Sequence, residues 1–176
     1  MKYFTPELLE RFRSPDPAIA DAASKEWDRA LAEYEKHLES IRGKLPEQLK
    51  DLLDNYCLHD ARVRAVSLPD QRMYLILAQP EDARDHVLLL SYRLVREPEF
   101  VRYAPGEEAA PAEWMYEEID VEQQEPPVYS QSVLLSDGRE LRLHFRDMGL
   151  TPLPLPVFEM GQQLLADGLQ PLKHAS

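Results

Sequence analysis

The spacing of hydrophobic residues changes at the segment Leu58-His59-Asp60. Before this segment, hydrophobic residues recur every three or four positions, which is typical of amphipathic helices. After it they alternate with polar residues or form short aliphatic blocks, which is typical of strands. Helices followed by strands predict an α+β fold, in which an N-terminal helical layer packs on an antiparallel sheet of about six strands.

The pattern predicts one domain over residues 1–176. A helical head would cover residues 1–57 and a strand-rich body residues 58–148. The C-terminal segment, residues 149–176, is rich in proline and has room for a short helix. Because proline lacks a backbone N–H group, we expect regular structure to stop after Thr151.

The helical head contains two helix starts of the same kind. Thr5 and Asp16 are each followed by proline, so a capping side chain precedes the residue favoured in the first helical turn. We expect the second helix to end at Gly43, because glycine readily takes the left-handed conformation that closes helices. Pro46 opens a third helix, and the short link predicts that the second and third helices pack as a hairpin.

The strand-rich body is marked by alternation and by turn residues. Residues 61–66 alternate, and residues 87–95 are rich in leucine and valine. Asp137-Gly138 lies between two hydrophobic segments and supplies the positive φ angles of a tight hairpin. Residues 114–121 carry acids on both faces, so we expect that strand at an edge of the sheet.

Charge narrows the range of partners. The chain has 32 acidic and 20 basic residues and a net charge of −12, which argues against nucleic acid or an anionic membrane as the main partner. No segment reaches the roughly 20 hydrophobic residues needed to span a bilayer, and the first residues lack the features of a signal peptide. A single cysteine, Cys57, excludes an internal disulfide. We therefore expect a cytoplasmic protein without a cofactor.

Three segments carry a resemblance to a known family: Met-Lys-Tyr-Phe-Thr-Pro-Glu-Leu at the start, Leu58-His59-Asp60-Ala61-x-Val63, and Ser136-Asp137-Gly138-Arg139-Glu140-Leu141 with Phe145-x-Asp147. Together they resemble an uncharacterised bacterial family of small cytoplasmic proteins, of the domain-of-unknown-function kind. The last segment also resembles strand hairpins of small toxin-immunity proteins, which are acidic α+β binders without catalysis. The resemblance implies a fold and a bacterial source more than a function, and it assigns no activity to any residue.

The predicted edge strand supplies the first candidate site. Its aromatic residues are surrounded by acids, and such residues are frequent anchors of protein interfaces. We therefore expect a non-enzymatic, acidic protein-binding module, immunity-like or regulatory. The expected contact residues are Trp114, Tyr116, Glu117 and Glu118. Because acids along this edge would repel an identical copy, we expect a monomer or a weak dimer.

An alternative function is a metal-dependent hydrolase that uses His59 and Asp60. The adjacent pair resembles the dipeptide that names a class of metal-dependent phosphohydrolases, whose ligands lie in an all-helical fold. Here the pair opens a strand, where neighbouring side chains point to opposite faces, and a metal site needs three or four converging ligands. His144 shares its strand face with Arg142 and Arg146, which predicts a solvated polar face rather than a further ligand.

Overall fold

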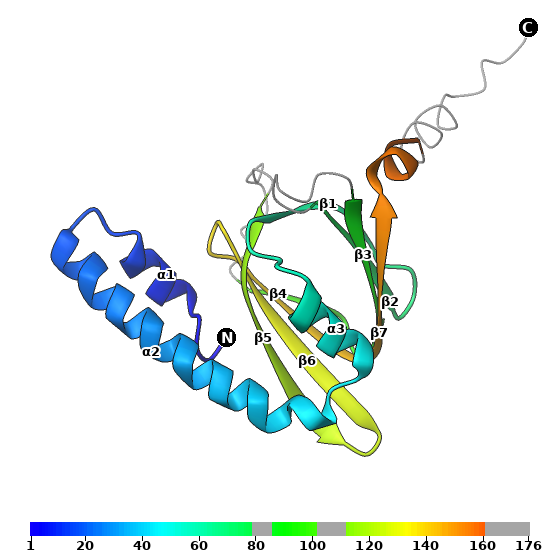
Figure 1. Ribbon diagram of the computed structural model, residues 1–176, viewed down its shortest axis with the longest axis horizontal. Helices are drawn as coiled ribbons and strands as arrows, with labels where there is room; N and C mark the ends of the chain where they lie inside the picture. The colour runs from blue at the N-terminus through cyan, green and yellow to red at the C-terminus, as the bar shows by residue number, and fades with distance from the viewer. Residues whose placement is uncertain (79–85, 102–111, 161–176) are drawn as a thin grey trace, which may run out of the picture.

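The computed structural model describes residues 1–78, 86–101 and 112–160, and within them the protein is an α+β fold (Figure 1). Among these residues, no helix is both long and hydrophobic enough to cross a membrane. The elements are α1 (Pro6–Phe12), α2 (Pro17–Ile41), the 3₁₀ turn η1 (Arg42–Lys44), α3 (Glu47–Asn55), β1 (Ala61–Ser67), β2 (Arg72–Ala78), β3 (His86–Leu94), β4 (Glu99–Val101), β5 (Glu113–Gln124), β6 (Pro127–Leu135) and β7 (Glu140–Pro154).

The first two helices begin as the sequence predicts. The hydroxyl of Thr5 accepts a hydrogen bond from the backbone N–H of Leu8, and the carboxylate of Asp16 accepts one from Ala18. The end of α2 differs from the prediction. The chain tightens into the turn η1, in which Gly43 does not take a positive φ angle, so the predicted left-handed glycine is wrong.

The seven strands form one antiparallel sheet in the order β3-β2-β1-β5-β6-β7-β4. Because β7 also pairs with β3, six of the strands close into a barrel and β4 is an additional strand on β7. The structure confirms the N-terminal helices and the antiparallel sheet. The sheet closes on itself, however, so it is not a flat layer that one helical layer could cover.

The strand β7 closes the barrel and corrects the prediction for the C-terminal segment. It pairs with β6 up to Phe145 and with β3 from Phe145 to Pro154. The predicted end of regular structure after Thr151 is therefore wrong. Pro152 and Pro154 are separated by one residue, so their missing N–H groups fall on the same edge of the strand. Beyond Phe145 one edge of β7 has no strand partner among the described residues, and an unpaired edge tolerates proline.

The helices pack against two hydrophobic cores. The core inside the barrel contains Phe145, the buried residues of α3, and Ile41 and Leu45, which lie on either side of η1. The aromatic residues Phe4, Trp27 and Tyr34 form a second core with Leu134, on the outer side of the sheet. In Figure 1, α1 and α2 accordingly lie together at one side of the barrel, whereas α3 lies across its front. Thus α2 packs mainly on the second core and reaches the barrel core at Leu38 and Ile41, near its C-terminal end, whereas α3 packs on the barrel core.

The strand β5 contains a bulge that decides where its side chains lie. Trp114 pairs with Leu135 and Tyr116 pairs with Leu134, so Met115 is one extra residue on β5. The bulge shifts the alternation of faces. Trp114 packs in the barrel core, whereas Tyr116 packs against the second core beside α2.

Candidate functional site

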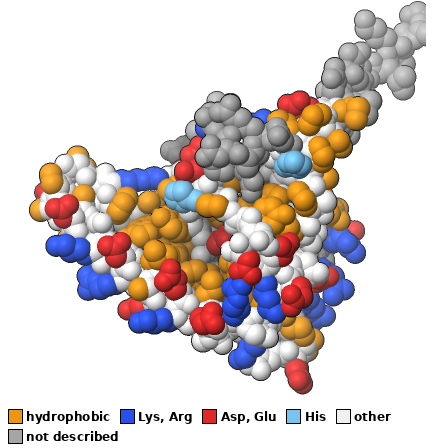
Figure 2. Space-filling view, in the orientation of Figure 1, with side chains coloured by type: hydrophobic (Ala, Val, Ile, Leu, Met, Phe, Trp, Pro, Cys, Tyr) orange, Lys and Arg blue, Asp and Glu red, His pale blue; other side chains and the backbone are white. Residues whose placement is uncertain are grey.

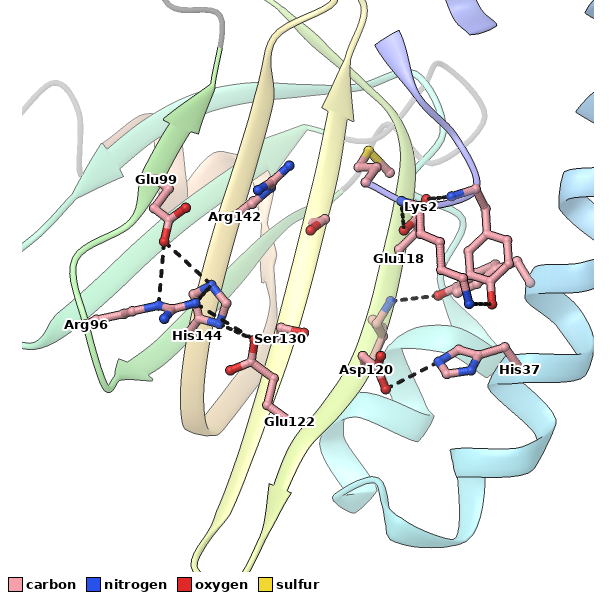
Figure 3. Close-up of a pocket in the computed structure, with 15 residues that line it drawn as sticks. Lys2, His37, Arg96, Glu99, Glu118, Asp120, Glu122, Ser130, Arg142 and His144 are labelled. Carbon is pink, nitrogen blue, oxygen red and sulfur yellow. Dashed lines mark hydrogen bonds and ion pairs between the residues drawn. The ribbon is translucent and has the colours of Figure 1, made fainter. Parts of the chain in front are cut away.

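A polar cavity of about 400 Å³ lies on the outer face of β5, β6 and β7 (Figure 3). Strand alternation explains its composition, because every second residue of each strand points to this face. Glu118 and Asp120 of β5, Ser130 of β6, and Arg142 and His144 of β7 are among the residues that line it. Residues before α1 and on α2 bound one side, and the segment leading into β4 bounds the other.

Arg96, Glu99, Glu122 and His144 form one wall of the polar cavity. Nδ1 of His144 lies 2.8 Å from Oε1 of Glu122, and Nε2 of the same ring contacts the guanidinium group of Arg96. Nε of Arg96 lies 3.6 Å from Oε1 of Glu99. His144 is only 5% exposed. The predicted solvated position of this histidine is therefore wrong, because Arg96 and Glu122 cover it from other segments of the chain.

Glu140 lies on the same strand face as His144 and is also buried. Its carboxylate accepts hydrogen bonds from Arg142 and from the amino group of Met1. Burial acts to raise the pKa of Glu140, but these hydrogen bonds outweigh burial and hold the pKa below its usual value. Ionised Glu140 thus orders Arg142 beside the cavity.

Glu118 and Asp120 form the opposite wall. The carboxylate of Glu118 accepts hydrogen bonds from the backbone N–H groups of Lys2, Tyr3 and Phe4, at 2.7, 2.7 and 2.8 Å. Oδ1 of Asp120 lies 3.3 Å from Nε2 of His37 on α2. Glu118 thus holds the residues before α1 on the sheet, whereas Asp120 remains exposed at the rim.

A second cavity, of about 350 Å³, lies beside β5 between α2 and the end of α3, and Tyr34 lines both cavities. We call it the aromatic cavity, because Tyr34, Tyr56, Trp114 and Tyr116 line it, together with Glu117 and His59. Nε1 of Trp114 donates a hydrogen bond of 2.6 Å to Oε2 of Glu117. Burial raises the pKa of Glu117 to about 7, against the opposing effects of Trp114 and the amide of Gln131.

The four predicted contact residues therefore line two different cavities. Trp114, Tyr116 and Glu117 line the aromatic cavity, whereas Glu118 lines the polar cavity. Trp114 is 1% exposed, so the prediction of an exposed aromatic edge is wrong at this position. In the strand order β5 lies between β1 and β6, although it pairs with β1 only at Trp114 and Glu113. The role of these residues in binding a partner stays a prediction.

His59 and Asp60, the residues of the hydrolase hypothesis, contact nearby groups of the same chain. Nδ1 of His59 lies 2.7 Å from the carbonyl oxygen of Met115, and its Nε2 lies 3.5 Å from Oδ1 of Asp60. In the described part of the chain, no group of three or more His, Cys, Asp and Glu side chains is placed to hold a metal ion. The hydrolase hypothesis stays a prediction.

Sequence reasoning missed the polar cavity as a site. Its signal was present in the alternation of Glu118, Asp120 and Glu122 and in the matching alternation of Arg142 and His144. Recognising the cavity required the pairing of β5 with β6 and of β6 with β7, which juxtaposes these faces. Comparison with protein-family models, curated proteins and solved structures finds no match to this chain.

Proposed function

We propose that this protein is a non-enzymatic, acidic module of the bacterial cytoplasm that binds a basic protein partner through the polar cavity. The observation that carries the proposal is the ring of partly exposed carboxylates at the rim. The side chains of Glu99, Asp120 and Glu122 are 47%, 56% and 39% exposed. The net charge of −12 adds a long-range attraction for a basic surface.

The cationic side chains beside these carboxylates can be replaced by cations of a partner. Arg96 lies near Glu99 and Glu122, and His37 lies near Asp120. Such partly exposed ion pairs contribute little to stability, so a cation of the partner replaces them at small cost. Rim charges of this kind act mainly on the association rate and on selectivity between partners. Occupying the basic surface of a partner would give the module an immunity-like or regulatory effect.

Affinity capture with matched charge variants tests the proposal. The tag belongs at the C-terminus, because the residues before α1 pack on β5. The rim variant combines Glu99→Gln, Asp120→Asn and Glu122→Gln. The control variant combines Asp21→Asn, Asp28→Asn and Glu33→Gln, three exposed positions of α2. Both variants lose the same number of negative charges, so they differ only in where the charge is removed.

We expect the wild type and the control variant to capture the same basic protein, and the rim variant to lose it. High salt should weaken the wild-type complex, because salt screens exposed charges. Equal capture by the rim and control variants would contradict the proposed site. Capture that survives high salt in all three proteins would contradict the electrostatic basis of the proposal.

A further inference from the structure

The aromatic cavity is distinct from the site proposed for the protein partner. Figure 2 shows hydrophobic side chains gathered over the region between α2 and α3. The cavity opens in this region, and Leu31 and Leu53 contribute to its wall beside the aromatic rings. A concave, largely apolar site with few polar groups is the usual form of a small-molecule site.

One ionisable group makes the aromatic cavity unusual. The bulge at Met115 places Glu117 beside Trp114, among apolar side chains. Removing a carboxylate from water is costly unless a cation or several hydrogen-bond donors compensate. Among the described hydrogen bonds and ion pairs, none joins Glu117 to a lysine or an arginine, and its donors, the indole N–H of Trp114 and the amide of Gln131, are both neutral. In the part of the chain that the structure describes, the carboxylate therefore lacks a counter-charge of its own.

The surrounding rings are of the kind that stabilise organic cations. An ammonium group is attracted to the faces of Trp and Tyr rings, and this attraction strengthens when water is excluded. Tyr116 lies at the centre of the ring cluster, with its centroid 4.7 Å from Trp27 and 5.2 Å from His59. Trp114, Tyr34 and Tyr56 complete the aromatic wall.

We propose that the aromatic cavity binds a small organic cation, an ammonium group carried on an apolar body, with Glu117 as its counter-ion. The carboxylate supplies charge complementarity, the rings stabilise the cation, and the leucine side chains accept the apolar body. The volume of about 350 Å³ lies near the lower end of ligand sites, which favours a free small amine over a longer peptide segment. The proposal does not depend on the protein partner of the polar cavity.

The other titratable groups around Glu117 do not supply the missing charge. Tyr34 on α2 and Tyr92 on β3 face it, and burial raises the pKa of both hydroxyls, so both stay neutral. Tyr56 and Cys57 follow α3 and also line the cavity. His59 also lines the cavity. Ionisation of Glu117 therefore favours amine binding at higher pH.

Three probes test the proposal: 2-phenylethylammonium, the neutral 2-phenylethanol, and N-acetyl-lysine methylamide as a mimic of a protein side chain. Binding is followed through the NMR signal of the Trp114 indole N–H, which lies at the cavity wall. The variant Glu117→Gln keeps the size of the side chain and an acceptor for Trp114. The matched control is Asp120→Asn, which removes one charge from the opposite face of β5.

We expect 2-phenylethylammonium to bind the wild type and Asp120→Asn equally, and Glu117→Gln to bind it at least about tenfold more weakly. The neutral alcohol should bind weakly and equally to all three proteins. Raising the pH from about 6 to about 8 should strengthen wild-type binding roughly tenfold, as the carboxyl ionises. The variant His59→Gln should retain this pH dependence, whereas Glu117→Gln should lose it.

Three outcomes would overturn the proposal. The first is that the aromatic amine does not shift the Trp114 signal. The second is that the amine and the alcohol bind equally well and Glu117→Gln binds both like the wild type, which would indicate a purely apolar site. The third is that only the lysine mimic binds, which would identify a protein side chain as the occupant. None of these outcomes predicts how the rim variant of the polar cavity behaves. The amine-binding proposal can therefore fail while the protein-binding proposal stands, and the reverse also holds.

Discussion

The backbone N–H of Ile119 on β5 donates a hydrogen bond of 2.9 Å to the hydroxyl of Tyr34 on α2. Both residues are buried, and 85 positions separate them in the chain. The contact supplies a hydrogen-bond acceptor where one edge of β5 has no neighbouring strand among the described residues, because β5 pairs with β1 only at its first two residues. Beyond them, the edge of β5 that faces away from β6 needs other acceptors. The helix supplies one of them from a tyrosine that also packs in the second core.

We therefore expect Tyr34→Phe to lower the free energy of unfolding by about 1–3 kcal/mol, because the buried N–H of Ile119 loses its acceptor. Urea denaturation measures the change. The control is Tyr3→Phe, whose hydroxyl bonds to the exposed amine of Lys2 and should change stability by less than about 0.5 kcal/mol. Equal effects of the two substitutions would show that the bond to Ile119 contributes nothing specific.

Glu118 leads to a second prediction. A glutamine at this position has one acceptor oxygen in place of two, so it cannot hold all three backbone N–H groups of residues 2–4 in the same way. We expect Glu118→Gln to destabilise the fold by about 1–3 kcal/mol and to speed amide exchange at Tyr3 and Phe4. Hydrogen exchange followed by mass spectrometry checks the second effect.

The control for Glu118→Gln is Glu125→Gln, an exposed position after β5 that loses the same charge. Its exchange at residues 2–4 should match the wild type. If Glu118→Gln also leaves this exchange unchanged, packing of Phe4 in the second core is sufficient to hold the segment, and the carboxylate is not its anchor.

Features decided by a few adjacent residues could be predicted from the sequence. Thr5-Pro6 and Asp16-Pro17 begin helices because the cap and the proline act within one turn. Asp137-Gly138 lies in the turn between β6 and β7, where Gly138 takes a φ angle of +83°, whereas the positive φ angle predicted for Asp137 is wrong. In each case the physical cause lies within about four residues, so no knowledge of the sheet was needed.

The candidate sites depend on features that no local pattern reports. A regular strand would place Trp114 and Tyr116 on one face, and the bulge at Met115 separates them and brings Glu117 to the side of Trp114. His144 is buried by a contact with Arg96, 48 positions away. A bulge changes the face on which a residue lies, and a contact with a distant segment changes its exposure. The hydrophobic pattern of one strand determines neither the bulge nor the contact.

Gly138 and Gly43 are both predicted to take a left-handed, positive-φ conformation, and only Gly138 does so. Gly138 has a positive φ angle, so Gly138→Ala should destabilise the fold by about 1 kcal/mol. Gly43 lies in the 3₁₀ turn with no positive φ angle, and among the described residues no atom beyond its chain neighbours lies within 4 Å of an added Cβ. Gly43→Ala should therefore be neutral or stabilise by up to about 1 kcal/mol. Thermal unfolding compares the two, and a loss at Gly43 as large as that at Gly138 would support the left-handed cap that the sequence predicts.

The raised pKa of Glu117 predicts how stability changes with pH. In the unfolded chain this carboxyl ionises near its ordinary value of 4.5, whereas in the folded protein it ionises only near 7. Below both values the group is protonated in both states and has no effect. As the pH rises from about 4.5 to about 7, the unfolded state gains a charge that the folded state resists, so stability falls.

The variant Glu117→Gln removes this group while the other titrating residues stay in place. We expect the difference in unfolding free energy between Glu117→Gln and the wild type to grow in favour of the variant between pH 4.5 and 7, by up to about 3 kcal/mol, and to level off above pH 7. Urea titrations at several pH values measure it, with Asp120→Asn as the exposed control. A difference that does not vary with pH would show that Glu117 ionises alike in both states, because water reaches its carboxylate in the aromatic cavity.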